Sequence, residues 1–326
     1  MYQFLAKGVR VMQIYEYKPS DMPPLGATAV ALGFFDGVHL AHRELIERTV
    51  KEANLRGLKS TVFTFSSESG TLKSSSPRIY STEEKLDIIS TLGVDAVIIA
   101  EFNSVSSMTA EQFISDTLVG DLDARVVLAG YNFRFGKGAL GDAEALKLGM
   151  ARLGLEAIIL DEYCYSGKPL SSSLVREALA VGDVALAAEL LGAPYRLRAR
   201  VVRGRGEGRK MGIPTVNADI PPGRLLPRLG VYRTVVPIDG KIYTGLTNVG
   251  ECPTFGARAV HAETYILDYF GDLYGRDVNI YFLGFIRDER TFPNAEELLL
   301  QIERDKACAI KKNEGDIIKW TEYGLS

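Results

Sequence analysis

The chain has 326 residues, of which 46% are hydrophobic and 24% are charged, and its formal net charge is −3 at pH 7. This composition excludes a disordered chain, and the length favours two domains. The slightly acidic balance argues against a dedicated nucleic-acid-binding protein. No apolar run suits a membrane helix or a signal peptide, so we expect neither. Cys164, Cys252 and Cys308 are widely spaced, which predicts free thiols and a cytoplasmic location.

The first half of the chain alternates between strand and helix patterns. Apolar and β-branched runs predict strands at residues 28–33, 60–65, 96–100, 125–130 and 157–160. Amphipathic stretches and a capping box predict helices at residues 40–55, 83–92, from 109 onward, and 143–153. Strands separated by helices run parallel, so this half is expected to form an open, doubly wound α/β sheet of the Rossmann-like kind. Ligands of such sheets bind beyond the carboxyl ends of the strands.

The second half of the chain has a different pattern. Two short helices are expected at residues 173–180 and 183–191, and Gly192 and Pro194 then break the chain. Gly/Pro turns separate short β-rich runs, which predict strands at residues 195–202, 231–237, 242–248, 262–267 and 278–283, with one helix at 295–311. Such strands without intervening helices predict an all-β antiparallel barrel with a C-terminal helix. We therefore predict two domains, residues 1–190 and 191–326.

The first candidate site follows the first strand, in residues 33–42. Glycines there, Gly33 and Gly37 among them, permit tight turns and the close approach of a phosphate to the backbone. The start of the following helix offers unpaired N–H groups and the positive end of the helix dipole. His39 and His42 share one face of the first helical turn and can reach the same anion. These features predict a phosphate-binding site.

A serine run before the helix at residues 173–180 adds to this site. Ser171, Ser172 and Ser173 can cap the start of the helix. Arg176, one turn further on, can bind a phosphate through two parallel hydrogen bonds. A serine run alone more often only caps a helix, so its weight comes from the other motifs of this chain.

The second candidate site is the glycine-rich stretch at residues 204–217. It is not a dinucleotide fingerprint, because Arg209 stands where the third glycine would be, and it lacks the lysine-serine/threonine of a P-loop. Thr215 and Asn217 face the same way in an extended chain, and their oxygen atoms suit Mg²⁺. The residues expected to cover phosphates with backbone amides are Gly204, Gly206, Gly208, Lys210 and Gly212.

The motifs of the first half resemble the bacterial bifunctional riboflavin kinase/FMN adenylyltransferase family. Residues 33–42 are similar to its HxGH signature, residues 130–136 to its flavin- and nucleotide-contacting loop, and residues 171–176 to its SSTxxR segment. The resemblance implies a nucleotidyltransferase domain that transfers AMP from ATP to FMN, assisted by Mg²⁺, with catalytic His39, His42 and Arg176. It assigns substrate binding to Gly33, Phe34, Phe35, Asp36, Gly37, Asn132, Phe133, Phe135, Ser172 and Ser173.

The motifs of the second half resemble the riboflavin kinase part of the same family. Residues 204–217 are similar to its GxxLGxPTAN motif, and residues 247–255 to its NIGxRPTF run. The resemblance implies that ATP phosphorylates riboflavin, with Glu263 as the base, Mg²⁺ at Thr215 and Asn217, and Arg287 in substrate binding. The two halves together imply a chain that makes FMN from riboflavin and FAD from FMN.

Two departures from the family pattern keep a second function open. Ala41 replaces the glycine of HxGH, and residues 66–69 lack the family's Pro-His pair. The alternative is therefore a riboflavin kinase with a weakened or inactive adenylyltransferase domain. A nucleic-acid-binding regulator is disfavoured because no aromatic residues interleave the basic residues in 196–210. We expect small-molecule substrates and no nucleic-acid or membrane partner, while the sequence does not determine the oligomeric state or the role of residues 312–326.

Overall fold

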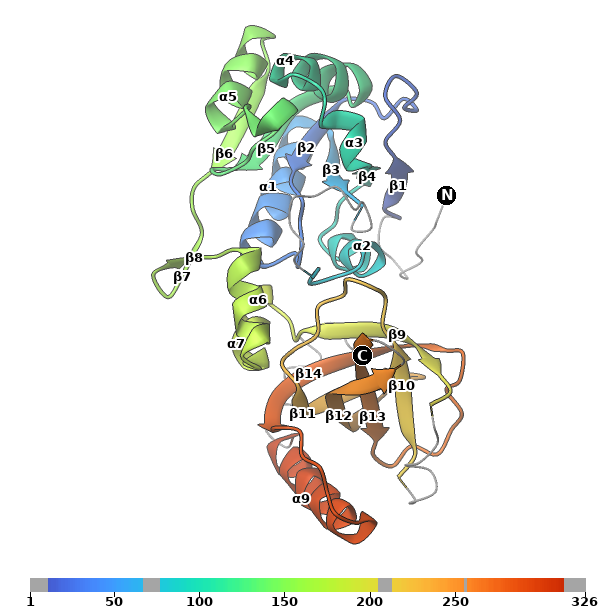
Figure 1. Ribbon diagram of the computed structural model, residues 1–326. Helices are drawn as coiled ribbons and strands as arrows, with labels where there is room; N and C mark the ends of the chain where they lie inside the picture. Colours follow the sequence, from blue (N-terminus) through green and yellow to red (C-terminus); the bar gives the residue numbers. More distant parts are fainter. Residues whose placement is uncertain (1–10, 67–76, 205–212, 255–256, 314–326) are drawn as a thin grey trace. The chain divides into compact units, whose positions relative to one another are not determined.

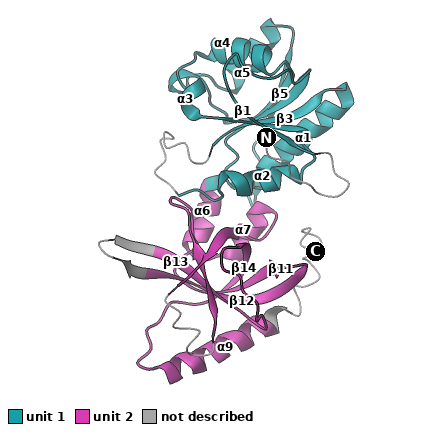
Figure 2. Cartoon of the chain, turned by 90° about the vertical axis from the view of Figure 1, so that its right-hand side faces the viewer, with its two compact units in different colours: residues 1–172 teal, residues 173–326 magenta. Residues whose placement is uncertain are grey.

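The computed structural model describes residues 11–66, 77–204, 213–254 and 257–313. The chain divides into two units, residues 1–172 and 173–326 (Figures 1 and 2). The boundary predicted at residue 190 lies further along the chain, after the helix α6 (Ser172–Ala180) and near the end of the helix α7 (Val184–Leu191). Among the described helices, none combines the length and the apolar character needed to cross a membrane.

Six of the described strands form a parallel sheet in the first unit. The strands are β1 (Gln13–Glu16), β2 (Thr28–Leu32), β3 (Lys59–Phe65), β4 (Ala96–Ala100), β5 (Ala124–Gly130) and β6 (Glu156–Leu160). Their order is β1-β4-β3-β2-β5-β6, and every neighbouring pair is parallel. This confirms the predicted doubly wound sheet. The strand order reverses between β2 and β5, so the carboxyl ends of these two strands mark the expected ligand site.

Helices cover both faces of the sheet (Figure 1). Alternating residues of β2 point to opposite faces, with Ala31 in the core beneath α1 and α2 and Leu32 in the core of the other face. The described helices are α1 (Leu40–Arg56), α2 (Thr82–Ser90), α3 (Phe102–Val105), α4 (Ala110–Gln112), the π-helix η1 (Phe113–Asp121), the short 3₁₀-helix η2 (Lys137–Ala139) and α5 (Ala143–Arg152). A small hairpin, β7 (Cys164–Tyr165) and β8 (Lys168–Pro169), follows β6.

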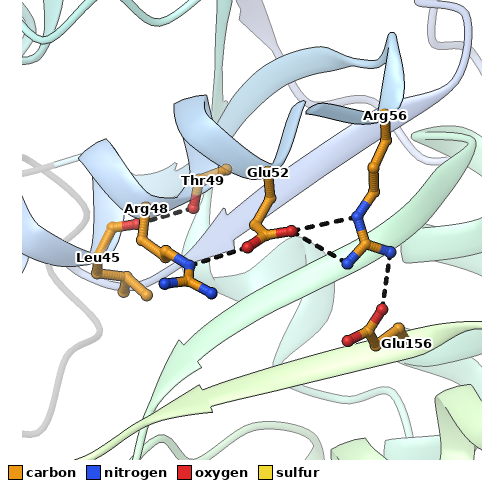
Figure 3. A network of polar contacts seen from close by, with 6 residues as sticks. All are labelled: Leu45, Arg48, Thr49, Glu52, Arg56 and Glu156. Atoms are coloured by element: carbon orange, nitrogen blue, oxygen red, sulfur yellow. Dashed lines mark hydrogen bonds and ion pairs between the residues drawn. The ribbon is translucent and has the colours of Figure 1, made fainter. Parts of the chain in front are cut away.

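A polar network anchors α1 to β6 (Figure 3). The buried carboxylate of Glu52 accepts hydrogen bonds from Arg48 at 2.9 Å and from Arg56 at 3.0 Å, and Arg56 also reaches Glu156 at 2.7 Å. Burial raises the pKa of Glu52, but the hydrogen bonds and charges of Arg56 and Arg48 outweigh burial and hold this pKa below its ordinary value. The network links β6 to the C-terminal part of the helix that carries the first candidate site at its N-terminus.

Two features of the first unit differ from the sequence pattern. β1 was not expected, because four half-exposed edge residues carry little periodic signal. The predicted capping box at Thr109 opens α4, but the helix continues as the π-helix η1. The hydroxyl of Tyr17 donates to Asp121 at 2.7 Å and lies 2.8 Å from the hydroxyl of Thr117, so the widened helix is tied to the segment after β1.

The second unit contains a closed antiparallel barrel. Its described strands are β9 (Arg196–Val202), β10 (Thr215–Asp219), β11 (Gly230–Ile238), β12 (Lys241–Thr254), β13 (Ala257–Ile266) and β14 (Asp277–Arg287). The order is β10-β13-β12-β11-β14-β9, and β9 pairs with β10 to close the barrel. The helix α9 (Ala295–Asn313) follows. The predicted barrel with its C-terminal helix is confirmed, with β10 as a strand that the sequence indicated only as an extended segment.

Side chains along the barrel strands point alternately into and out of the barrel. A row of threonines therefore lies inside, and the residues of the second candidate site lie outside. Thr234, Thr247 and Thr264 are fully buried, and their hydroxyls form a chain across β11, β12 and β13 with oxygen–oxygen distances of 2.9 and 2.8 Å. Successive residues of a strand point to opposite faces. Asn248 and Glu263 therefore lie on the outer face of the barrel.

Candidate active sites

The first candidate site lies at the carboxyl end of β2, in a loop with unusual backbone angles. Phe35 and Val38 have φ angles of 54° and 42°, in the left-handed region that side chains disfavour. Both residues are fully buried, and the Phe35 ring lies so close to Gly33 that a Cβ there would be 2.7 Å from it. Strained backbone of this kind persists where the surrounding structure holds it, and it clusters at functional sites.

Three attachments from other segments hold this loop. The Asp36 carboxylate accepts a hydrogen bond from the backbone N–H of Ile79 at 3.0 Å. The Ser172 hydroxyl donates to the Asp36 carbonyl oxygen at 2.8 Å, and the Lys85 ammonium group donates to the Phe34 carbonyl oxygen at 3.3 Å. The structure therefore brings the serine run and the loop together.

His39 and His42 stack on each other at the N-terminus of α1. Their ring centroids are 3.6 Å apart, and the ring planes differ by 16°. His39 is the N-cap residue, and neither Nδ1 atom finds a hydrogen-bond partner among the described residues. Burial lowers the pKa of His39 to about 4, and burial, together with the charges of His39 and Lys85, lowers the pKa of His42 well below its ordinary value. Both imidazoles are therefore neutral at pH 7.

The segment after β5 lies at the same edge of the sheet, because β5 pairs with β2. Asn132 is exposed, and Phe133 is half-buried with its ring stacked on Phe135 at a centroid distance of 5.6 Å. Phe135 is 7% exposed and packs against Phe113 in the core. Asn132 is thus accessible to a ligand, whereas Phe135 supports the segment from the core.

Two more of the predicted residues follow on α6. Ser173 is exposed, and Arg176 is half-buried. Arg176 lies four residues after Ser172, one turn further along the helix, which is the spacing that the predicted phosphate-binding segment requires. Their contact with a phosphate stays a prediction.

The second candidate site forms where β10, β13 and β12 lie side by side. Asn217 pairs with Glu263, and Glu263 pairs with Asn248, so the three side chains form a row across the strands. Thr215 lies on the same face of β10 as Asn217 and pairs with Tyr265. The barrel therefore brings the two predicted metal ligands and the predicted base to one face.

Two cavities flank this row, and Thr215 lines both. The larger, of about 410 Å³, is bordered by Gly204, Asn217 and residues 269–274. The smaller, of about 350 Å³, is bordered by Glu263 and by side chains of α9. Thr215 therefore lies on the border of both cavities.

The oxygen atoms of Thr215 and Asn217 fit a magnesium ion. They are hard donors, few in number, beside a cavity that can hold phosphates. Asn217 packs so tightly over Gly204 that a Cβ there would lie 2.3 Å from Asn217 Nδ2. Across the described residues there is no group of three or more His, Cys, Asp or Glu side chains that could hold a metal ion. An ion at Thr215 and Asn217 would therefore depend on oxygen atoms of the substrate.

Arg287, at the end of β14, is engaged by α9. Its Nε and Nη2 atoms each lie 2.9 Å from the carboxylate of Asp305, and Gln301 donates to the same carboxylate at 2.9 Å. The side chains of Arg287 and Asp305 are 13% and 4% exposed. This buried pair attaches α9 to the barrel and borders the smaller cavity, so Arg287 has a structural partner besides its predicted role in binding.

Some predicted residues are not among those that the structure describes, and some functional candidates were not predicted. Gly206, Gly208, Lys210 and Gly212 lie outside the described residues, as do residues 67–69 of the segment that lacks Pro-His. Lys85, Asn248 and Asp305 have no role predicted from the sequence. A signal for Lys85 was present, because it falls on the buried face of α2 with Leu86 and Ile89, where a charge needs specific partners.

Comparison with known proteins assigns each half of the chain to a family model. Residues 22–174 match the model described as FAD synthetase, and residues 191–312 match the model described as riboflavin kinase. A crystal structure of a Streptococcus pneumoniae protein, described as a macrolide-efflux protein, is similar with a TM-score of 0.83 and 30% identity. The similarity covers 91% of this chain and 99% of that one.

Two bacterial relatives match over most of their length. The bifunctional riboflavin kinase/FMN adenylyltransferase of Bacillus subtilis is 33% identical, over 87% of this chain and 92% of the relative. The protein of the same name from Escherichia coli K12 is 34% identical, over 88% of this chain and 93% of the relative. The matches span both units, and the chain belongs to the bifunctional riboflavin kinase/FMN adenylyltransferase family.

Proposed function

We propose that this chain phosphorylates riboflavin to FMN in a domain of residues 191–326 and adenylylates FMN to FAD in a domain of residues 1–190. The observation that carries the proposal is that each half matches the family model of one of these activities. The alternative, a riboflavin kinase alone, is disfavoured because the FAD synthetase model matches residues 22–174. The matched residues include Ala41, so the chain matches the FAD synthetase model despite this departure from the HxGH signature.

In the kinase reaction, the 5′-hydroxyl of riboflavin attacks the γ-phosphorus of ATP. Its oxygen forms a bond to phosphorus, the bond to the bridging oxygen breaks, and ADP leaves. Glu263 accepts the hydroxyl proton, because a hydroxyl group is a poor nucleophile until it loses this proton. We place the flavin in the smaller cavity beside Glu263 and ATP in the larger cavity beside Gly204, because Thr215 borders both. Thr215 and Asn217 would hold Mg²⁺, which when bound offsets the negative charge of the phosphates.

In the adenylyltransferase reaction, a phosphate oxygen of FMN attacks the α-phosphorus of ATP, and pyrophosphate leaves. The phosphate is already ionised, so the site must position and stabilise charge rather than remove a proton. The neutral imidazoles of His39 and His42 would donate N–H hydrogen bonds to the phosphates rather than supply positive charge. Arg176 would supply positive charge, and the N-terminus of α1 adds its N–H groups.

The remaining predicted residues take supporting parts in this proposal. Asn132 would orient the bound nucleotide, and the loop of residues 33–37 would approach the phosphates through its backbone. Small molecules are the expected substrates, without a nucleic-acid or membrane partner. The consumption of ATP in both steps supports the cytoplasm as the expected location.

Variants that separate the two activities test this proposal. Glu263→Gln keeps the shape of the side chain but cannot accept the proton, so FMN formation should fall by about 10²- to 10⁴-fold. The same protein given FMN should make FAD at the wild-type rate, which is measured by chromatography of the flavins. His39→Gln with His42→Gln should show the reverse pattern, with FMN accumulating from riboflavin. Loss of both activities in either variant would contradict the assignment of one reaction to each domain.

A further inference from the structure

Lys85 is a buried lysine at the carboxyl ends of two central strands. It lies on α2, and its side chain is almost fully buried. Its ammonium group donates to the carbonyl oxygens of Phe65 at 2.6 Å and Phe34 at 3.3 Å, and to the hydroxyl of Thr64 at 3.1 Å. These three contacts match the three N–H donors of a lysine. The group is therefore occupied by the protein itself and is not directed at a substrate.

The contacts of Lys85 converge on the beginning of the strained loop. The Phe34 carbonyl oxygen receives hydrogen bonds from both Lys85 and Thr64, the latter at 3.0 Å. Phe35, the next residue, is the first to adopt a left-handed backbone angle. Strain of this kind lasts only where several contacts fix the backbone. Lys85 fixes the start of the loop, while Ser172 holds its middle at Asp36.

The helix α2, which carries Lys85, has a stabilised N-terminus. Ser81 and Glu84 form a capping box at its N-terminus, in which each side chain bonds to the other's backbone N–H. Leu86 and Ile89 bury the same face of the helix in the core. A rigid element thus carries the lysine to the loop, as a positioned site requires.

The charge of Lys85 also reaches the stacked histidines. It is one of the causes that lower the pKa of His42, after burial and the charge of His39. A neutral side chain in its place would remove this repulsion, and the pKa of His42 would rise. Lys85 therefore acts on His42 through its charge in addition to its hydrogen bonds to the loop.

We propose that Lys85 is a positioning residue for the adenylyltransferase site, which holds the strained loop and so sets His39 and His42 toward the reacting phosphates. The proposal rests on the adenylyltransferase function proposed above for residues 1–190. Lys85 acts through the backbone at Phe34 and through the shared hydrogen bonds with Thr64, without touching the substrate.

The test uses the full-length chain with Lys85→Met, which keeps the length of the side chain but removes its charge and donors. Lys59→Met is the matched control, since Lys59 is an exposed lysine at the opposite end of β3. We expect kcat for FAD formation from FMN to fall by about 100-fold in Lys85→Met, as for a displacement of about 1 Å at a reacting site. The KM values for FMN and ATP should change less than about threefold, because Lys85 does not touch either substrate. Riboflavin kinase activity in both variants should equal that of the wild type.

A second readout follows the histidines directly. The chain has three histidines, so their imidazole signals can be assigned by substitution and titrated by NMR. The titration midpoint of His42 should rise in Lys85→Met and stay unchanged in Lys59→Met. A wild-type value of kcat in Lys85→Met, or a loss confined to KM, would overturn the proposal.

Two further measurements apply if Lys85→Met does not fold or if the wild-type chain makes no FAD. If Lys85→Met does not fold, Thr64→Val removes the shared hydroxyl and should lower kcat by about tenfold, the effect of one hydrogen bond to a charged group. A wild-type rate in Thr64→Val would then overturn the proposal. If the wild-type chain makes no FAD, the proposed function has failed, and NMR still decides on Lys85, because imidazole chemical shifts of His39 and His42 in Lys85→Met that equal those of the wild type would contradict its hold on the loop.

Discussion

Substitution of Gly204 by alanine should disable the kinase site through a single side chain. A Cβ at this position would lie 2.3 Å from Asn217 Nδ2, whereas ordinary contact begins at 3.4 Å. The amide of Asn217 must therefore move by about 1 Å, and a displacement of that size can cost about 100-fold in rate. Because Asn217 is a proposed magnesium ligand, the loss should be smaller at high Mg²⁺ concentration.

The assay measures initial rates of FMN formation from riboflavin and ATP over a range of Mg²⁺ concentrations. Gly284→Ala is the matched control, since it lies on β14 of the same barrel and a Cβ there would meet its nearest neighbour, Arg233, at 3.9 Å. FAD formation from supplied FMN reports on the integrity of the rest of the chain. A Gly204→Ala rate within threefold of the Gly284→Ala rate would refute the reasoning about Asn217.

Three further predictions concern the titration, the attachment of α9 and the metal. The pKa of His39 is about 4 in the folded chain and ordinarily 6.5, so between these pH values the unfolded state binds more protons and the free energy of unfolding rises with pH. Denaturant titration measures the loss of unfolding free energy when the pH is lowered from 7 to 4. This loss should be about 3 kcal/mol smaller in His39→Gln than in the wild type. Equal losses in the two proteins would contradict the buried, neutral state of His39. Asp305→Asn leaves the charge of Arg287 buried and should cost about 3–5 kcal/mol in the unfolding of the barrel, whereas Asp239→Asn, in an exposed pair with Arg276, should leave the unfolding midpoint unchanged. EDTA should stop FMN formation, and Thr215→Ala should raise the Mg²⁺ concentration needed to restore it; activity that persists in EDTA would exclude the proposed ligands.

Local sequence patterns were sufficient for the architecture because each half shows a consistent pattern, alternating helices and strands in the first and successive strands without intervening helices in the second. Helical and strand patterns alternate through the first half, and chain connectivity then requires parallel strands. β1 and β10 were harder to predict, since one is a four-residue edge strand and the other is defined by its pairing with β9 and β13. The π-helix η1 contacts residues far from it in the chain, as Tyr17 contacts Thr117, and local sequence does not encode such contacts.

The candidate sites could be predicted by residue type but not by environment. The pattern placed His39 and His42 on one helical turn, yet their lowered pKa values follow from burial in the fold and, for His42, also from the charge of Lys85, far along the chain. The row formed by Asn217, Glu263 and Asn248 depends on the register of three strands. Pairing across strands and burial are properties of the whole fold, so the sequence alone could not determine them.

The two activities of this chain can be tested in one incubation of the purified wild-type protein with riboflavin, ATP and Mg²⁺. The flavins are separated by chromatography over time. We predict that FMN forms first and is then converted to FAD, with both conversions carried out by the same chain. FMN that accumulates without any FAD would contradict the adenylyltransferase assignment, and the absence of both products would contradict the function as a whole.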